Sequence, residues 1–117
     1  MRGDDNHFHA KALIDGKAVE FLVDTGASTI VLSHNDAIAA GFSVDNLIFS
    51  IPVSTANGNT RAAPVTLSSV QIGAIERRRI KALVAQQGNL KTSLLGMNFL
   101  QTLSGFNFQG DRLILTD

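Results

Sequence analysis

The chain has 117 residues, of which 44% are hydrophobic and 17% charged, a balance typical of one folded domain. Ten basic residues balance ten acidic ones, so the charge gives no reason to expect nucleic acid or an anionic membrane as a partner. The absence of cysteine excludes disulfides, thiolate metal sites and a cysteine nucleophile. No apolar run approaches the ~20 residues that span a bilayer, and no signal-peptide core is present.

Turn residues divide the sequence into many short strands, which favours an all-β barrel or sandwich. The expected strands cover residues 7–14, 17–23, 29–32, 47–53, 62–67, 70–75, 80–85, 105–108 and 112–115. Two short helices are expected, over residues 34–40 and 97–103. Ser33 is the expected N-cap of the first helix, and Gly41 its end. We expect one domain over residues 1–117, with residues 1–6 disordered or the edge of a truncated piece.

Two dipeptides are strong signals for two-residue hairpins. Asp15-Gly16 and Asn57-Gly58 both suit a type I′ turn, in which the two central residues have positive φ. Asn57-Gly58 lies in the polar stretch 54–60 between two expected strands. A third pair of strands is expected to turn at Gly110-Asp111.

The segment 22–28 (Leu-Val-Asp-Thr-Gly-Ala-Ser) is the most informative part of the chain. Asp24 ends an apolar strand and begins a tight turn. A carboxylate held there is costly unless it is hydrogen-bonded or chemically employed. Seventy residues later, Leu94-Leu95-Gly96 opens the second expected helix. With these segments, and with the polar hairpin between them, the chain resembles the retropepsin-like, single-lobed aspartic proteases, in particular their bacterial branch.

The resemblance covers residues 7–115 and implies a closed acid-protease-like barrel. It also implies an aspartic endopeptidase that needs no metal or cofactor and acts on extended polypeptide segments. Because only one Asp-Thr-Gly is present, the second catalytic carboxylate must come from Asp24 of another copy in a homodimer. Two carboxylates so close share one proton, because like charges at such a separation cannot both ionise. The ionised one activates water and the protonated one donates to the developing oxyanion.

The same resemblance assigns supporting roles around Asp24. Thr25 is expected to hydrogen-bond across the dimer, and Gly26 to let the backbone approach the carboxylate. Ala27 and Ser28 complete this loop, with Ser28 expected to donate to Asp24. Leu94, Leu95 and Gly96 are expected to pack beside the loop. The expected flap over the substrate is formed by Thr55, Ala56, Asn57, Gly58 and Asn59.

Several other interpretations remain open. His7 and His9 lie on one strand face and could bind a metal, but a third ligand at suitable spacing is missing, so a solvated pair is favoured. Arg77-Arg78-Arg79 is interpreted as a solvated turn rather than a nucleic-acid site. Retroviral members usually carry an acidic residue after Asp-Thr-Gly-Ala and an arginine after the second glycine. Here those places hold Ser28-Thr29 and Met97-Asn98, so subsite recognition does not transfer.

Two other functional states fit the same sequence. The chain could be an inactive retropepsin-fold module for dimerisation or peptide binding, or a processed or inactive precursor form. Bacterial relatives of this kind often follow a membrane anchor. Membrane contact is therefore expected only through an N-terminal anchor outside the given sequence, which would indicate an envelope or periplasmic location.

Overall fold

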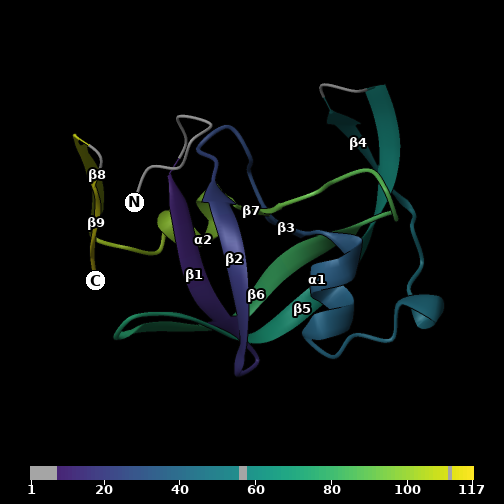
Figure 1. Cartoon of the computed structure of the whole chain (residues 1–117), viewed down its shortest axis with the longest axis horizontal. Coiled ribbons are helices and arrows are strands. Elements are labelled where there is room, and N and C mark those ends of the chain that lie inside the picture. The colour runs from purple at the N-terminus through teal and green to yellow at the C-terminus, as the bar shows by residue number, and fades with distance from the viewer. Residues whose placement is uncertain (1–7, 56–57, 111) are drawn as a thin grey trace.

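The computed structural model describes residues 8–55, 58–110 and 112–117, and a closed β-barrel forms the body of the molecule (Figure 1). The elements are β1 (His9–Ile14), β2 (Lys17–Val23), β3 (Ile30–Leu32), α1 (His34–Ala39), the 3-10 turn η1 (Val44–Asn46), β4 (Ile51–Thr55), β5 (Gly58–Ile72), β6 (Ile75–Ala85), β7 (Ser93–Leu95), α2 (Met97–Leu100), β8 (Gly105–Gln109) and β9 (Arg112–Thr116). Within these described residues, neither helix has the length and apolar character needed to cross a membrane.

Six strands close the barrel in the order β1-β2-β7-β3-β6-β5, and β5 returns to pair with β1. The predicted all-β barrel is therefore confirmed. Two of the pairings are parallel, β2 with β7 and β3 with β6, and they join segments far apart in the sequence. The core is filled by large side chains with no exposed surface, including Phe21, Ile30 and Phe99. β4 extends the sheet beyond the barrel by pairing with the first residues of β5.

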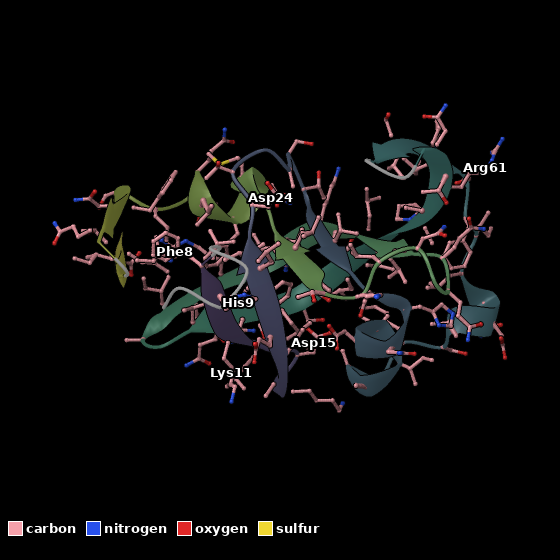
Figure 2. The ribbon with its side chains drawn as sticks, turned by 45° about the horizontal axis from the view of Figure 1, so that its top comes forward. Phe8, His9, Lys11, Asp15, Asp24 and Arg61 are labelled. Atoms are coloured by element: carbon pink, nitrogen blue, oxygen red, sulfur yellow. The ribbon has the colours of Figure 1, made fainter. Side chains whose placement is uncertain are left out.

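The β1–β2 hairpin turns at Asp15-Gly16, as predicted. Asp15 has φ 51° and Gly16 φ 86°, the positive values of a type I′ turn. The same turn also closes the barrel, because Asp15 N–H donates to Ser69 O (3.1 Å) and Ser69 N–H donates to Asp15 Oδ1 (2.9 Å). Figure 2 shows Asp15 at the tip of this hairpin. One residue thus joins the turn to β5 near the C-terminal end of that strand.

Both helices begin where the sequence predicts. Ser33 caps α1 by accepting a hydrogen bond from Asp36 N–H (3.1 Å), and Gly41 follows the helix with φ 100°. The second predicted helix, 97–103, is longer than the observed α2, which ends at Leu100. Thr102 Oγ1 donates to Phe99 O (2.6 Å) there, so a side chain satisfies the carbonyl at the end of α2.

Two strand predictions and one turn prediction were wrong. The predicted strand 70–75 contains a turn, because Gly73 has φ 58° and β5 ends at Ile72 before β6 begins. Arg77-Arg78-Arg79 lies inside β6 rather than in a turn. The predicted strand 47–53 starts later, at Ile51, because η1 and an irregular segment precede it.

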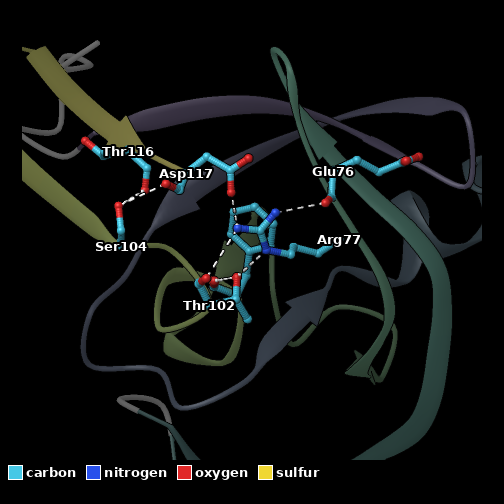
Figure 3. A network of polar contacts seen from close by, with 7 residues as sticks. Glu76, Arg77, Thr102, Ser104, Thr116 and Asp117 are labelled. Atoms are coloured by element: carbon cyan, nitrogen blue, oxygen red, sulfur yellow. Dashed lines mark hydrogen bonds and ion pairs between the residues drawn. The ribbon is translucent and has the colours of Figure 1, made fainter.

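The two C-terminal strands form a separate two-stranded sheet beside the barrel (Figure 1). Arg77 of β6 links the C-terminal end of this sheet to the turn after α2. Its guanidinium donates to Thr102 Oγ1 (3.0 Å) and Thr102 O (3.3 Å) and pairs with the Asp117 carboxylate (Figure 3). Ser104 Oγ donates to the carbonyls of Thr116 and Asp117 (3.2 and 3.0 Å). The C-terminal end is thereby fixed to the barrel.

Candidate active site

The carboxylate of Asp24 lies in a turn held by backbone hydrogen bonds. Asp24 N–H donates to Leu95 O (3.1 Å), and Ala27 N–H donates to Asp24 O (3.1 Å). Gly26 N–H donates to Asp24 Oδ1 (2.9 Å), so one carboxylate oxygen has a fixed backbone donor. Asp24 itself is half-buried. The turn therefore holds the acidic group in one orientation while keeping it accessible.

Gly26 is the residue in closest contact with this carboxylate. A Cβ at position 26 would lie 3.2 Å from Asp24 Oδ1, which is tighter than an ordinary contact. The absence of a side chain lets the Gly26 N–H reach the carboxylate. Thr25 and Ser28 are exposed in the single chain, and Ala27 is half-buried. No hydrogen bond joins Ser28 Oγ to Asp24 within the described part of this chain, so that predicted donation stays a prediction.

The second loop lies directly against the first. β7 runs parallel to β2, with Leu94 opposite Leu22 and Leu95 opposite Val23. Gly96 follows and touches the backbone of Thr29 so closely that a Cβ would lie 2.4 Å from Thr29 O. The structure thus brings together the two segments that the sequence singled out, seventy residues apart.

Asn98 connects these loops to β6. Its Oδ1 accepts from Ile30 N–H (2.9 Å), and its Nδ2 donates to Lys81 O (2.6 Å). Its backbone N–H donates to Ser28 O (3.1 Å). One side chain therefore bridges the end of the Asp24 loop and β6. Sequence reasoning missed this role, since the partners of Asn98 lie 17 and 68 residues away.

An open groove of about 570 Å³ lies over Asp24. Its lining combines small and polar loop residues with apolar strand residues: Asp24, Gly26, Ala27, Ser28, Thr29, Val31, Val53, Ser54, Thr60, Arg61, Ala62, Leu83, Ala85, Asn89, Leu90 and Leu94. Leu94, Val31 and Leu83 are neighbours across β7, β3 and β6. They form an apolar row beside the carboxylate, which the sequence pattern did not distinguish from core.

The β4–β5 hairpin forms one wall of the groove through Val53, Ser54 and Thr60. At its base, Thr60 Oγ1 donates to Gln86 Oε1 (3.0 Å) and accepts from Asn89 Nδ2, which ties the hairpin to the loop after β6. Figure 2 shows Arg61 at this end of the molecule, with Asp24 nearer the middle.

The described members of the predicted flap, Thr55, Gly58 and Asn59, all belong to this hairpin. The register pairs Thr55 with Gly58 and Ser54 with Asn59, so the connection consists of residues 56 and 57. This lies one residue earlier than the predicted Asn57-Gly58 pair, because the ladder that starts at Ile51 and Ala62 fixes the register. Ala56 and Asn57 themselves lie outside the described residues.

Metal-binding groups do not gather in the described ranges. No cluster of three or more His, Asp or Glu side chains suited to a metal ion occurs there. His7, one of the two histidines considered as ligands, lies outside the described residues. The Nδ1 of His9 lies 3.8 Å from Glu20 Oε2 on the neighbouring strand.

The chain forms a single barrel with one Asp-Thr-Gly turn. The Leu94-Leu95-Gly96 loop packs against this turn, and an open groove lies over both. These features define an acid-protease-like fold of the single-lobed kind. Residues 10–102 match the family model described as "gag-polyprotein putative aspartyl protease". The chain belongs to this family, the retropepsin-like aspartic proteases.

Solved structures agree with this membership. A retropepsin-like aspartic protease from Rickettsia conorii is 43% identical and superposes with a TM-score of 0.87, covering 97% of this chain and 85% of that one. EIAV protease in complex with the inhibitor HBY-793 shares the fold at 18% identity, with a TM-score of 0.70 over 87% of this chain and 92% of that one.

Two bacterial relatives match along the sequence. One, from Sinorhizobium, is an uncharacterized protein in the cobV 5′ region and is 49% identical over 113 residues. The other is an uncharacterized protein of Rickettsia prowazekii, 44% identical over 114 residues. Each match covers 97% of this chain but only 48% of the relative. The chain thus spans about half the length of these relatives.

Proposed function

We propose that two copies of this chain form an aspartic endopeptidase that hydrolyses peptide bonds in extended polypeptide segments. The observation that carries the proposal is the position of Asp24. Its carboxylate is accessible in an open groove, and Gly26 N–H donates to one of its oxygens. The bracing by Leu95 and Asn98 holds the loop that carries this group. A fixed, accessible carboxylate is what water activation requires.

The chemistry needs two such carboxylates. In the proposed dimer, Asp24 and its symmetry mate face each other across a twofold axis and share one proton. The ionised carboxylate removes a proton from a water molecule, which attacks the peptide carbonyl carbon. The protonated carboxylate donates to the carbonyl oxygen as negative charge develops on it. Exposed Thr25, next to Asp24, is the residue proposed to contact the partner loop.

The groove supports an extended peptide as substrate. Its β4–β5 wall can clamp the peptide backbone as an added strand, with side chains reaching alternate pockets. The half-buried row of Leu94, Val31 and Leu83 favours apolar substrate side chains near the cleaved bond. The bacterial relatives favour a bacterial source for the chain.

The substitution Asp24→Asn tests this proposal. It keeps the shape of the side chain but removes the acid, so cleavage of an unfolded protein should fall by roughly a thousandfold or more. Asp45→Asn, on the exposed η1 turn outside the groove, is the matched control and should retain activity. Sedimentation should show the same dimer for both variants. Cleavage that survives in the Asp24→Asn dimer would overturn the proposed function.

A further inference from the structure

A second groove, of about 660 Å³, continues the first. It is lined by Ser28, Thr29, Ile51, Pro52, Val53, Pro64, Val65, Thr66, Lys81, Ala82 and Leu83. Four of these residues, Ser28, Thr29, Val53 and Leu83, also line the groove over Asp24. The two grooves therefore meet along the loop after Asp24 and the base of the β4–β5 hairpin. We call the second one the outer groove.

The strand register explains why the outer groove exists. Alternate β6 residues point to opposite faces, and Ala82 and Val84 are buried in the core. Leu83 and Lys81 consequently share the outward face. β5 places Pro64 opposite Leu83 and Thr66 opposite Lys81 on that face. The apolar row that begins beside Asp24 thus continues outward and reaches a lysine one step further along β6.

Lys81 is the one charged residue among those that line the outer groove. Its side chain is exposed, and none of the ion pairs among the described residues involves it. The remaining lining is apolar or carries hydroxyl groups. Lys81 has no counter-ion in the described part of the chain, and the other described lining residues are uncharged. Such a groove complements a ligand that combines apolar groups with one carboxylate.

We propose that the outer groove binds the side chains of the same extended substrate further from the cleaved bond, and that Lys81 selects an acidic residue there. This substrate class rests on the proposed protease function, since the outer groove is a continuation of its cleft. Ser28 and Thr29, which line both grooves, are uncharged. The positive side chain of Lys81, in the same groove, therefore attracts a substrate carboxylate without competition from these two loop residues.

The test uses peptides with one apolar cleavage sequence and a single Glu, Gln or Lys placed at each flanking position in turn. Binding is measured by fluorescence anisotropy with the Asp24→Asn chain, so that turnover is not required, and kcat/KM is measured with the active chain. At one position, Glu should be preferred over Lys by about fivefold to tenfold, and the preference should shrink in high salt. Lys81→Glu should reverse this preference.

Lys11→Glu is the matched control. Lys11 is exposed on β1 and lines neither groove, and Figure 2 shows it at the other end of the barrel from Asp24. Lys11→Glu changes the net charge by the same amount as Lys81→Glu, but it should leave the preference for Glu over Lys in the peptide unchanged. The inference is overturned if Lys81→Glu keeps the original preference, if Lys11→Glu changes it equally, or if no peptide binds. Charge-selective binding without any cleavage would instead contradict the proposed function alone.

Discussion

Gly96 shows how a single missing side chain holds the candidate active site together. A Cβ at this position would lie 2.4 Å from Thr29 O and 2.5 Å from Thr29 C, both backbone atoms that cannot rotate away. Gly96→Ala should therefore push the second loop off the Asp24 loop and lower the free energy of unfolding by about 3 kcal/mol or more. Urea unfolding measures this loss.

Gly105→Ala is the matched control for that substitution. A Cβ at Gly105 would meet nothing within 4 Å, so the free energy of unfolding should change by less than about 1 kcal/mol. Equal losses in the two variants would show that the contact between Gly96 and Thr29 is not tight in solution. The difference between the two variants thus measures the effect of the close contact between Gly96 and Thr29, apart from the general effect of replacing a glycine.

At the scale of elements, the β1–β2 hairpin owes its position to Asp15. Its Oδ1 accepts from Ser69 N–H, and its own φ is positive. Asp15→Ala removes the acceptor and places a less suitable residue at positive φ, so the free energy of unfolding should fall by about 2 kcal/mol. Asp15→Asn keeps a carbonyl acceptor and tolerates the turn, and should cost less than half as much. Chemical denaturation measures the free energy of unfolding of both variants. Equal losses in Asp15→Ala and Asp15→Asn would contradict the assigned hydrogen bond.

The C-terminal sheet depends on a second side-chain connection. Arg77 bridges Thr102 and Asp117, and its side chain is only 23% exposed. Arg77→Ala should release β8 and β9, raising amide hydrogen exchange there while the amides of β1 and β2 stay protected. Arg78→Ala is the control, because Arg78 is 71% exposed and its 3.5 Å ion pair is with the neighbouring Glu76. Faster exchange in both variants would contradict a specific role for Arg77.

Local turn chemistry could be predicted from the sequence because it depends on adjacent residues. Asp15-Gly16, Ser33 and Gly41 act where they were expected, since each satisfies a backbone need of its own segment. The turn at Gly73 was missed because apolar residues continue on both sides of it, so the pattern resembles one strand. Arg77 was misplaced for a related reason, since its partners lie 25 and 40 residues away.

The candidate site was predictable in its motif residues but not in its walls. Asp24 and Gly96 stand out because their residue types are unusual after apolar strands. Val31, Leu83 and Asn98 do not, because their place in the groove or brace follows from strand pairings between distant segments. An apolar residue in a short strand looks the same in sequence whether it faces the core or a groove.

For the whole molecule, the proposed shared site predicts how mixed subunits behave. If each dimer needs two intact Asp24 carboxylates, a mixed dimer with one Asp24→Asn subunit has a single acid and is inactive. After equal amounts of wild-type and variant subunits exchange, about one quarter of all dimers are fully wild type. This is half the number present before mixing, so activity per wild-type subunit should fall to about half.

Steady-state cleavage assays before and after exchange measure this ratio. Asp45→Asn subunits, mixed in the same way, should cause no fall. Unchanged activity after complete exchange with Asp24→Asn subunits would mean that one chain carries a whole site, which would contradict the shared carboxylate pair.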